Sequence, residues 1–287
     1  MSDQAEALRH LVRSRDQRSG GTRIITVTSG KGGVGKSNFS LNFALSLQEL
    51  GKKVLLFDAD ISMANIDVLM GAAAPYNLYH LIKGQQSIWD IVHEGTAGVH
   101  FIAGGSGFKD LLELKLEELE EIERQIGLLQ NVYDVILFDT GAGLTKETVR
   151  FITAAEETLV ITTPEPTSIT DAYALVKMVR AMDHDISFQL VVNRAVDWKE
   201  GKATADKIAL VAERFLGISL PTLGIIRDDP LVTKAVKRQM PFSQVYPGSI
   251  ASCDIRAIAR QFCAMPLARN EANGVKGFLH KMFRRMK

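Results

Sequence analysis

The sequence of 287 residues is poor in cysteine, in long apolar runs and in net charge. Its two cysteines, Cys253 and Cys263, lie late in the chain and are too few for a disulfide framework, which fits a reducing cytosol. No apolar run approaches the roughly 18 residues of a spanning helix, and the N-terminus lacks a signal-peptide core. Because the net charge is +1, any attraction to nucleic acid or to an acidic membrane must be local.

Apolar runs and helical patterns alternate from Arg23 to about Met265. Most runs are continuous in Val, Ile, Leu and Phe, which is typical of strands buried on both faces of a parallel sheet. This order predicts a doubly wound α/β fold with helices on both faces and ligands at the carboxyl ends of the strands. The predicted strands are Ile24–Thr28, Val54–Phe57, Val99–Ala103, Val135–Phe138, Leu159–Thr163, Gln189–Asn193 and Leu223–Ile226. The clearest separating helices are Leu116–Leu129, Asp171–Met182 and Ala205–Leu216.

Two appendages flank this predicted domain of residues 23–265. Residues 1–22 hold a short helical pattern followed by a polar linker. Residues 266–287 begin with Pro266 and an Asn- and Gly-containing linker, and end in a basic amphipathic segment. We therefore expect one globular domain with a flexible leader and a separate C-terminal helix.

A phosphate-binding loop follows the first predicted strand. Its sequence G-K-G-G-V-G-K-S fits G-x-x-x-x-G-K-[ST], and a helical pattern ending at Gly51 comes next. Glycines let backbone N–H groups surround phosphates, and the helix N-terminus adds positive potential. We expect Lys36 to reach the β- and γ-phosphates and Ser37 to bind Mg²⁺, which predicts ATP or ADP as the ligand. The predicted phosphate-binding residues are Gly30, Lys31, Gly32, Gly33, Val34, Gly35, Lys36 and Ser37.

Aspartates end two other predicted strands. Asp58 and Asp60 follow Val54–Phe57, and one such carboxylate can hold a metal-bound water while the other positions the attacking water. We expect Asp58 to support the metal site. Asp139 follows four apolar residues, which is the Walker B pattern, and would accept from a water on Mg²⁺. Solvated aspartates at strand ends are the alternative interpretation, but the adjacent glycine loop favours a hydrolytic site.

The loop holds a further lysine, Lys31, directly after its first glycine. The resulting segment K-G-G-x-G-K-S resembles the signature of the deviant Walker A ATPases, the family of MinD, ParA and the nitrogenase iron protein. The resemblance implies that Lys31 crosses a nucleotide-sandwich dimer to the partner's phosphates. It also implies that Asp60, in D-x-D-x-x-x-A-N-x-D, belongs to switch I and orients the hydrolytic water. Slow ATP hydrolysis, raised by dimerisation or a partner, is expected.

Two further segments resemble parts of this family's site. D-T-G-A-G from Asp139 resembles switch II, with Thr140-Gly141 where the family usually has Ser-Pro. The family resemblance assigns an adenine contact to Asn193, although a turn asparagine is a serious alternative. Arg227 and Asp228 occupy the place of the second base-contact loop, and their assignment is weaker.

The last segment of the chain carries an apolar stripe with basic flanks and no acidic residue. This pattern favours a helix lying in a membrane surface, and MinD-type proteins have such a C-terminal helix. Docking on its own domain is the main alternative, and a calmodulin-like target or a nucleic-acid tail is also possible. The two states can alternate if ATP-driven dimerisation releases the helix. The predicted membrane residues are Val275, Phe278, Leu279, Met282, Phe283 and Met286.

The leader carries D-Q-A-x-x-L-R, which resembles the leader of the FlhG group, also called FleN or YlxH. In that group the leader activates the GTPase FlhF, so the resemblance implies a partner contact. A disordered leader without function is the alternative. The matching residues are Asp3, Gln4, Ala5, Leu8 and Arg9.

Together these resemblances predict an ATP-dependent, dimerising and membrane-associating ATPase that regulates flagellar number and placement and stimulates FlhF. They imply a cytoplasmic protein that attaches to the inner face of the cell membrane through an anionic surface, and contacts with flagellar C-ring switch proteins. A MinD-type division-site regulator is the alternative, and a ParA-type DNA-segregation ATPase is a further one. No specific nucleic acid is expected, because DNA does not require the apolar stripe of the tail.

Overall fold

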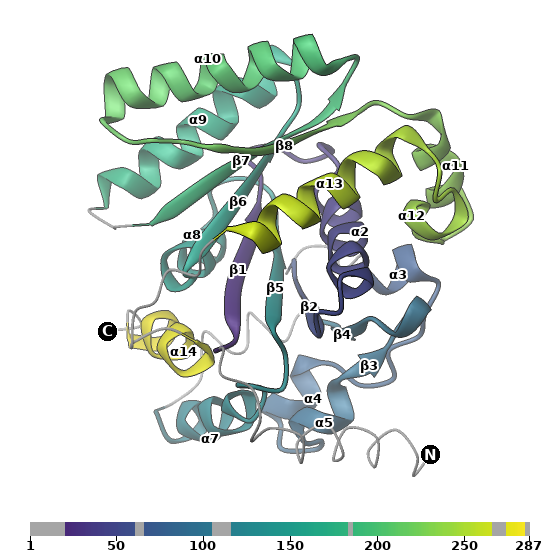
Figure 1. The fold of residues 1–287 in the computed structure, drawn as a ribbon. Helices are drawn as coiled ribbons and strands as arrows, with labels where there is room; N and C mark the ends of the chain where they lie inside the picture. Colours follow the sequence, from purple (N-terminus) through teal and green to yellow (C-terminus); the bar gives the residue numbers. More distant parts are fainter. Residues whose placement is uncertain (1–20, 61–65, 105–115, 183–185, 266–273, 285–287) are drawn as a thin grey trace.

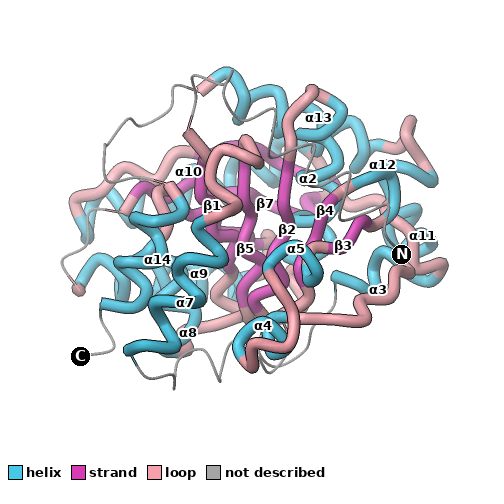
Figure 2. The backbone as a smooth tube through the Cα atoms, turned by 90° about the horizontal axis from the view of Figure 1, so that it is seen from below, coloured by secondary structure: helices cyan, strands magenta, loops and turns pink. Residues whose placement is uncertain are grey.

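The computed structural model describes residues 21–60, 66–104, 116–182, 186–265 and 274–284. One eight-stranded sheet lies between two layers of helices (Figures 1 and 2). The strand order is β3-β4-β2-β5-β1-β6-β7-β8, and every pair is parallel except β3 with β4. The prediction of a doubly wound, mostly parallel sheet is confirmed.

The elements follow one another in the alternating order that a doubly wound sheet requires. The strands are β1 (Arg23–Thr28), β2 (Val54–Ala59), β3 (His93–Glu94), β4 (His100–Ile102), β5 (Val135–Thr140), β6 (Glu157–Thr162), β7 (Ser187–Ala195) and β8 (Thr222–Arg227). The α-helices are α2 (Lys36–Glu49), α3 (Ile66–Met70), α4 (Leu78–Ile82), α5 (Ile88–Ile91), α7 (Leu116–Gly127), α8 (Lys146–Ala154), α9 (Pro166–Ala181), α10 (Trp198–Leu216), α11 (Pro230–Lys237), α12 (Phe242–Val245), α13 (Ile250–Ala264) and α14 (Val275–Arg284). A short 3₁₀ turn, η2, spans Thr96–Gly98.

The central strands are buried along their whole length, as their continuous apolar sequences predict. Every residue of β1, β2, β5 and β6 is buried. The antiparallel edge strand β3 was not predicted, because its two residues, His93 and Glu94, carry no apolar run. It adds one short pairing beside β4 and does not change the topology.

Two helices begin earlier than their apolar patterns indicate. The structure starts α9 at Pro166 rather than Asp171, and α10 at Trp198 rather than Ala205. Proline is favoured in the first turn of a helix, where its missing N–H is not needed. At α10 the Asp197 side chain accepts a hydrogen bond from the Glu200 N–H, which caps the helix. Caps and polar first turns set these boundaries, and hydrophobic periodicity does not detect them.

Helices α2 and α13 cover one face of the sheet, and α7, α8 and α14 cover the other, with α9 and α10 beside β6 and β7 (Figure 1). Side chains alternate between the two faces along β5. Leu137 therefore packs into the core beneath α2 and α13, and Phe138 packs into the core beneath α7, α8 and α14. Among the described residues, no helix combines the length and the apolar composition needed to cross a bilayer.

The C-terminal helix α14 is docked on the body of the protein. Its residues Val275, Phe278, Leu279 and Met282 are buried in the core formed with α7 and α8. The structure therefore shows the docked state, which was the alternative interpretation of the tail. Attachment to a membrane through α14 would require this helix to leave its site. The Phe283 side chain and Met286 lie outside what the structure describes.

Candidate nucleotide-binding site

The glycine loop connects β1 to α2 at the carboxyl edge of the sheet. Gly33 and Gly35 have left-handed backbones, with φ of +81° and +88°, which only glycine adopts without strain. A Cβ atom at Gly35 would also lie 2.5 Å from Nδ2 of Asn193. The loop therefore needs glycine for its conformation and for its close approach to β7. It lines a cavity of about 430 Å³ together with Asp60 and Ala142.

A buried ion pair joins the loop lysine to the Walker B aspartate. Nζ of Lys36 lies 3.1 Å from Oδ1 of Asp139, and the two side chains are 7% and 1% exposed. The Ser40 hydroxyl donates to the same oxygen at 2.7 Å. The other oxygen, Oδ2, is buried with no hydrogen-bond partner among the described atoms. A buried acceptor left open in this way fits a further ligand, such as a water on a metal ion.

The donor set at this site suits Mg²⁺ bound together with a nucleotide. The described residues contain no cluster of three or more His, Cys, Asp or Glu side chains that could hold a metal ion alone. Mg²⁺ usually keeps several waters and takes the rest of its ligands from one or two protein groups and from phosphates. Ser37 lines the cavity at the start of α2, so Ser37 and Asp139 are the residues that would hold the ion.

The two aspartates at the end of β2 occupy different environments. Both carboxylate oxygens of the buried Asp58 accept backbone N–H groups, from Asp60 at 3.2 Å and from Ile66 at 3.1 Å. Asp58 thus ties together the two ends of the switch I segment, and its metal role stays a prediction. Asp60 faces the cavity, and a Cβ atom at Gly141 would lie 3.5 Å from its Oδ1. The two switch segments therefore meet at Asp60.

The signature lysine is held by its own chain in this structure. Nζ of Lys31 lies 3.1 Å from Oε2 of Glu165 and 2.9 Å from Oγ1 of Thr167, at the start of α9. The ion pair is partly exposed, so water screens it and it contributes little stability. Sequence reasoning missed Glu165 and Thr167, which carry no motif that links them to the loop.

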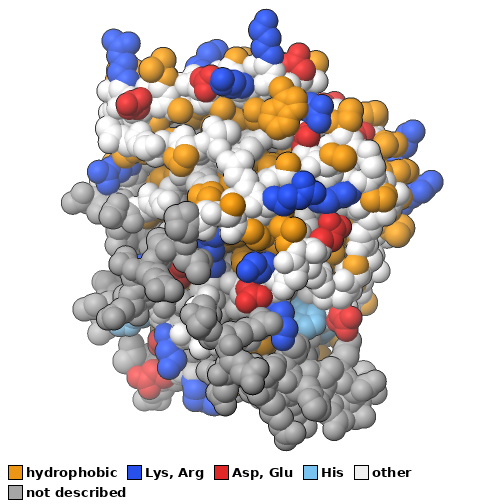
Figure 3. All heavy atoms as spheres, viewed as in Figure 1, with side chains coloured by type: hydrophobic (Ala, Val, Ile, Leu, Met, Phe, Trp, Pro, Cys, Tyr) orange, Lys and Arg blue, Asp and Glu red, His pale blue; other side chains and the backbone are white. Residues whose placement is uncertain are grey.

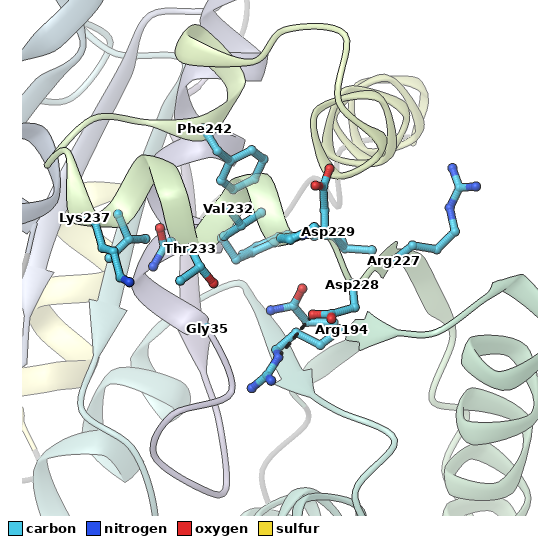
Figure 4. A pocket seen from close by; sticks show the side chains of 15 residues that line it. Gly35, Arg194, Arg227, Asp228, Asp229, Val232, Thr233, Lys237 and Phe242 are labelled. Carbon is cyan, nitrogen blue, oxygen red and sulfur yellow. Dashed lines mark ion pairs between the residues drawn. The ribbon is translucent and has the colours of Figure 1, made fainter.

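A second cavity of about 590 Å³ extends from the glycine loop between β7, β8 and α11. Asn193 lines it, but its Nδ2 donates to the Val34 carbonyl at 2.8 Å. Asn193 therefore positions the phosphate loop, and its predicted base contact stays a prediction. Figure 4 shows Thr233 and Lys237 of α11 along this cavity, two lining residues that the sequence motifs do not mark.

Arg227 lines the same cavity, and its predicted base contact stays a prediction. Its guanidinium makes hydrogen bonds of 3.0 and 2.7 Å to the Asp254 carboxylate on α13. These hydrogen bonds raise the pKa of Arg227 above its usual value. The arginine therefore links β8 to α13. Asp228 remains at the cavity and forms an ion pair of 3.5 Å with Arg194.

The predicted partner residues of the leader lie outside the described residues.

On the face of the molecule shown in Figure 3, basic and acidic side chains are interspersed. This distribution agrees with the net charge of +1 and gives that face no extended single-sign field.

Comparisons with known proteins agree with the geometry of the site. A family model described as an AAA domain matches residues 22–192, more than half of the chain. The chain is 36% identical over 261 residues to the antiactivator FleN of Pseudomonas aeruginosa, covering 91% of this chain and 93% of FleN. It is 36% identical over 266 residues to the flagellum site-determining protein YlxH of Helicobacter pylori, covering 90% of each.

A solved structure of MinD from Pyrococcus horikoshii in complex with Mg-ADP has the same fold. Its TM-score is 0.67 at 25% identity, covering 85% of this chain and 96% of that structure. This neighbour supports the use of an adenine nucleotide and Mg²⁺ in the family. The chain belongs to the MinD-like P-loop ATPases, in the group that contains FleN and YlxH, and is an ATPase.

Proposed function

We propose that this ATPase regulates the number and placement of flagella, acting as an ATP-dependent dimer that attaches reversibly to the membrane. The observation that carries the flagellar role is the similarity to FleN and YlxH, which extends over about nine-tenths of this chain. Their names describe an antiactivator and a flagellum site-determining protein. The protein would be cytoplasmic and peripheral on the inner face of the membrane.

The site would hydrolyse ATP by positioning and charge neutralisation. Phosphoryl transfer to water needs an oriented nucleophile and cations around the developing charge more than covalent chemistry. Mg²⁺, when bound, would neutralise charge on the β- and γ-phosphates. Lys36 would bind the phosphates, and Asp60 would orient the attacking water at the cavity that it lines.

Dimerisation would complete this site. Lys31 lies at the surface with 39% of its side chain exposed, where its ammonium can reach a second copy once it leaves Glu165. Sedimentation velocity with a non-hydrolysable ATP analogue tests this role. Lys31→Ala should bind the analogue as a monomer, while the natural protein forms a dimer. A dimer of Lys31→Ala would contradict the proposal.

Membrane attachment would use α14 after its release. In the docked state Lys276 and Lys281 are exposed while Val275, Phe278, Leu279 and Met282 are buried, so the exposed side chains that the structure describes on α14 are polar. Each cation near an anionic surface contributes about 1 kcal/mol, and each inserted apolar side chain roughly 1 to 2 kcal/mol. Ordering the helix opposes much of this gain. One copy would bind weakly, and two copies on a dimer on the order of 10²-fold more strongly.

Vesicle co-sedimentation tests the membrane role. The full chain should bind phosphatidylglycerol vesicles with the ATP analogue and much less with ADP. The double variant Lys276→Ala, Lys281→Ala should bind several-fold less. The variant Lys199→Ala, Lys202→Ala on α10 is a matched control, because all four lysines are exposed in the docked structure, and it should bind normally. Equal binding of both double variants would contradict a membrane role for α14.

The leader would stimulate the GTPase FlhF, and contacts with C-ring switch proteins would follow from the same group. Support for both comes from the group to which the chain belongs. GTP hydrolysis by FlhF should rise when a peptide of residues 1–22 is added, and less so when Gln4 or Leu8 is replaced by Ala. Absence of any effect from the peptide and from the full chain would favour a MinD-type regulator.

A further inference from the structure

Two of the three carboxylates near the end of β8 are used to hold the fold together. Both oxygens of Asp229 accept backbone N–H groups, one in α11 at 2.9 Å and one in α13 at 3.2 Å. Both oxygens of Asp254 accept hydrogen bonds from Arg227, at 2.7 to 3.0 Å. Asp228 differs from them, because 59% of its side chain is exposed and it lines the cavity beside the glycine loop. Of these three carboxylates, Asp228 is therefore the one that is placed to serve a ligand.

Arg194 reaches Asp228 from a distorted position in β7. Its φ is +59°, in the left-handed region that costs free energy for any residue with a Cβ atom. The residues on either side of it, Asn193 and Ala195, pair with consecutive residues of β8, so Arg194 is an extra residue in the ladder. A bulge of this kind changes the direction in which a side chain points. Strained backbone of this sort is found most often at functional sites, which draws attention to what Arg194 contacts.

The contact is an ion pair at the cavity. Nε of Arg194 lies 3.5 Å from Oδ1 of Asp228, and Figure 4 draws this pair as a dashed line among the side chains that line the cavity. The Asp228 N–H donates to the Ala195 carbonyl at 2.7 Å, which fixes the backbones of the two strands beside the pair. A carboxylate oxygen only accepts hydrogen bonds and a guanidinium only donates them. The pair therefore presents an acceptor and a donor side by side.

The cavity that holds this pair is the place for a nucleotide base. It shares Gly35 and Asn38 with the cavity of the glycine loop, so a nucleotide whose phosphates are bound by the loop would extend into it. Apolar side chains that suit a flat ring also line it, among them Ile226, Pro230 and Val232. The polar groups at this cavity can therefore determine which base is accepted.

Adenine and guanine carry their donors and acceptors in different orders. Adenine has one amino donor, N6, beside the ring acceptor N1, whereas guanine has the acceptor O6 beside two donors, N1–H and the N2 amino group. A carboxylate alone would favour guanine, because its two oxygens match two adjacent donors. With Arg194 on Oδ1, Asp228 keeps one oxygen for a single amino group, and the guanidinium offers a donor to a ring acceptor. That combination matches adenine.

We infer that Arg194 determines the base specificity of this ATPase, acting through Asp228 to favour adenine and to exclude guanine. Arg194 is a positioning residue in this role, because it sets which hydrogen bonds the carboxylate can make. Specificity of this kind comes from weakening the wrong ligand as well as from binding the right one. The inference rests on nucleotide binding at the glycine loop and is independent of the flagellar and membrane roles.

The test measures nucleotide affinity at equilibrium without lipid. Non-hydrolysable analogues of ATP and GTP are titrated into the full chain, at concentrations where sedimentation velocity shows a monomer. The readout is the Kd for the GTP analogue divided by the Kd for the ATP analogue. Arg194→Ala should lower this ratio about fivefold, the upper range for an exposed charge interaction. Arg194→Lys keeps a cation beside Asp228 and should retain most of the ratio of the natural protein.

An inosine analogue makes the test specific to the edge of the base. Inosine keeps the N1–H donor of guanine and lacks the N2 amino group, so Arg194→Ala should improve its binding by a smaller factor than that of the GTP analogue. Arg194→Gly removes the same ion pair and adopts the left-handed backbone without strain. It decides the question if Arg194→Ala does not fold.

A matched variant and a double variant provide the controls. Arg124 on α7 forms an ion pair of similar exposure with Glu121, and Arg124→Ala should leave the ratio unchanged. Asp228→Asn in the Arg194→Ala background replaces one acceptor by a donor, so it should restore the preference for ATP.

Three outcomes would overturn the inference. The first is an unchanged ratio in folded Arg194→Ala and Arg194→Gly. The second is a lowered ratio that persists in the double variant with Asp228→Asn, because the effect would then not pass through the carboxylate. The third is an equal loss of affinity for the ATP, GTP and inosine analogues, which would give Arg194 a purely structural role.

Discussion

The nucleotide site and the docking site of α14 lie on opposite faces of β2 and β5, and they are built in opposite ways. The nucleotide site buries charge and leaves it incompletely satisfied: Lys36 and Asp139 are almost fully enclosed, and Oδ2 of Asp139 has no described partner. The docking site buries apolar side chains such as Phe278 and Leu279, each at most 3% exposed.

The nucleotide site still has an unsatisfied group that a ligand can bind, whereas the docking site is already filled by α14. A buried, unpaired acceptor costs free energy until a ligand satisfies it. Packed rings have nothing left to satisfy, and they separate only when another apolar environment, such as a lipid surface, replaces the contact. The nucleotide site is therefore arranged to bind a ligand, and the docking site is arranged to release α14 to another apolar environment.

The largest effect is expected at the buried charge. Lys36→Ala should lower nucleotide affinity by about 10²-fold or more, because the phosphates lose an enclosed cation. It should also destabilise the fold by about 3 kcal/mol, since Asp139 stays buried without its partner. Isothermal titration and urea unfolding measure the two effects. Lys31→Ala, whose ion pair is exposed, is the control for both measurements. A similar loss of affinity and stability in Lys31→Ala would contradict the difference between the buried and the exposed lysine.

Hydrolysis should depend on Asp60 separately from binding. Asp60→Ala should reduce the rate of phosphate release by about 10²-fold, because the attacking water is no longer oriented, while ATP still binds. A coupled phosphate assay and an equilibrium titration separate the two quantities. Asp206→Asn on the exposed side of α10 is the control. Normal turnover in Asp60→Ala would remove this residue from the mechanism.

At the docking site, substitutions should act locally. Leu279→Ala should weaken docking of α14 by about 2 to 4 kcal/mol, because a fully buried side chain leaves a cavity. Amides of residues 275–284 should then exchange faster, with little change in the melting temperature of the whole protein. Lys276→Ala on the exposed side of the same helix should change neither quantity. A large drop in melting temperature would instead make α14 an integral part of the core.

The smallest effect is a pH dependence of stability at Glu156. Burial raises the pKa of this carboxyl above its usual 4.5, while the Gly274 N–H, Lys281 and Arg23 act in the opposite direction and Glu157 adds to the increase. A raised pKa means that the folded state favours the proton, so this contribution to stability is complete below pH 4.5 and disappears as the pH rises through the raised value.

The free energy of unfolding measured in urea should therefore increase slightly between pH 7 and pH 5. Glu156→Gln keeps an acceptor for the Gly274 N–H and cannot titrate, so it should lack this increase. The same slope in both proteins would assign the pH dependence to another group.

The sheet and the phosphate-binding loop could be predicted from the sequence, because each depends on short, contiguous segments. A buried strand, a glycine loop and a helix fix the geometry of Lys36 and Ser37 within one βα unit, and an aspartate at the end of an apolar run fixes Asp139. Membership in the FleN and YlxH group follows from the same local motifs together with the similarity along the chain.

Contacts between side chains that are distant in the sequence could not be predicted and came from the structure. It placed α14 on Phe138 and Phe151, directed Arg227 to Asp254, and turned the Asn193 amide toward the Val34 carbonyl. An apolar helical stripe has the same pattern whether its partner is lipid or protein, and the sequence does not encode that partner locally. Whether the stripe packs on protein depends on whether the rest of the chain offers a complementary surface. Here that surface is the face of β2 and β5 that carries Phe57 and Phe138.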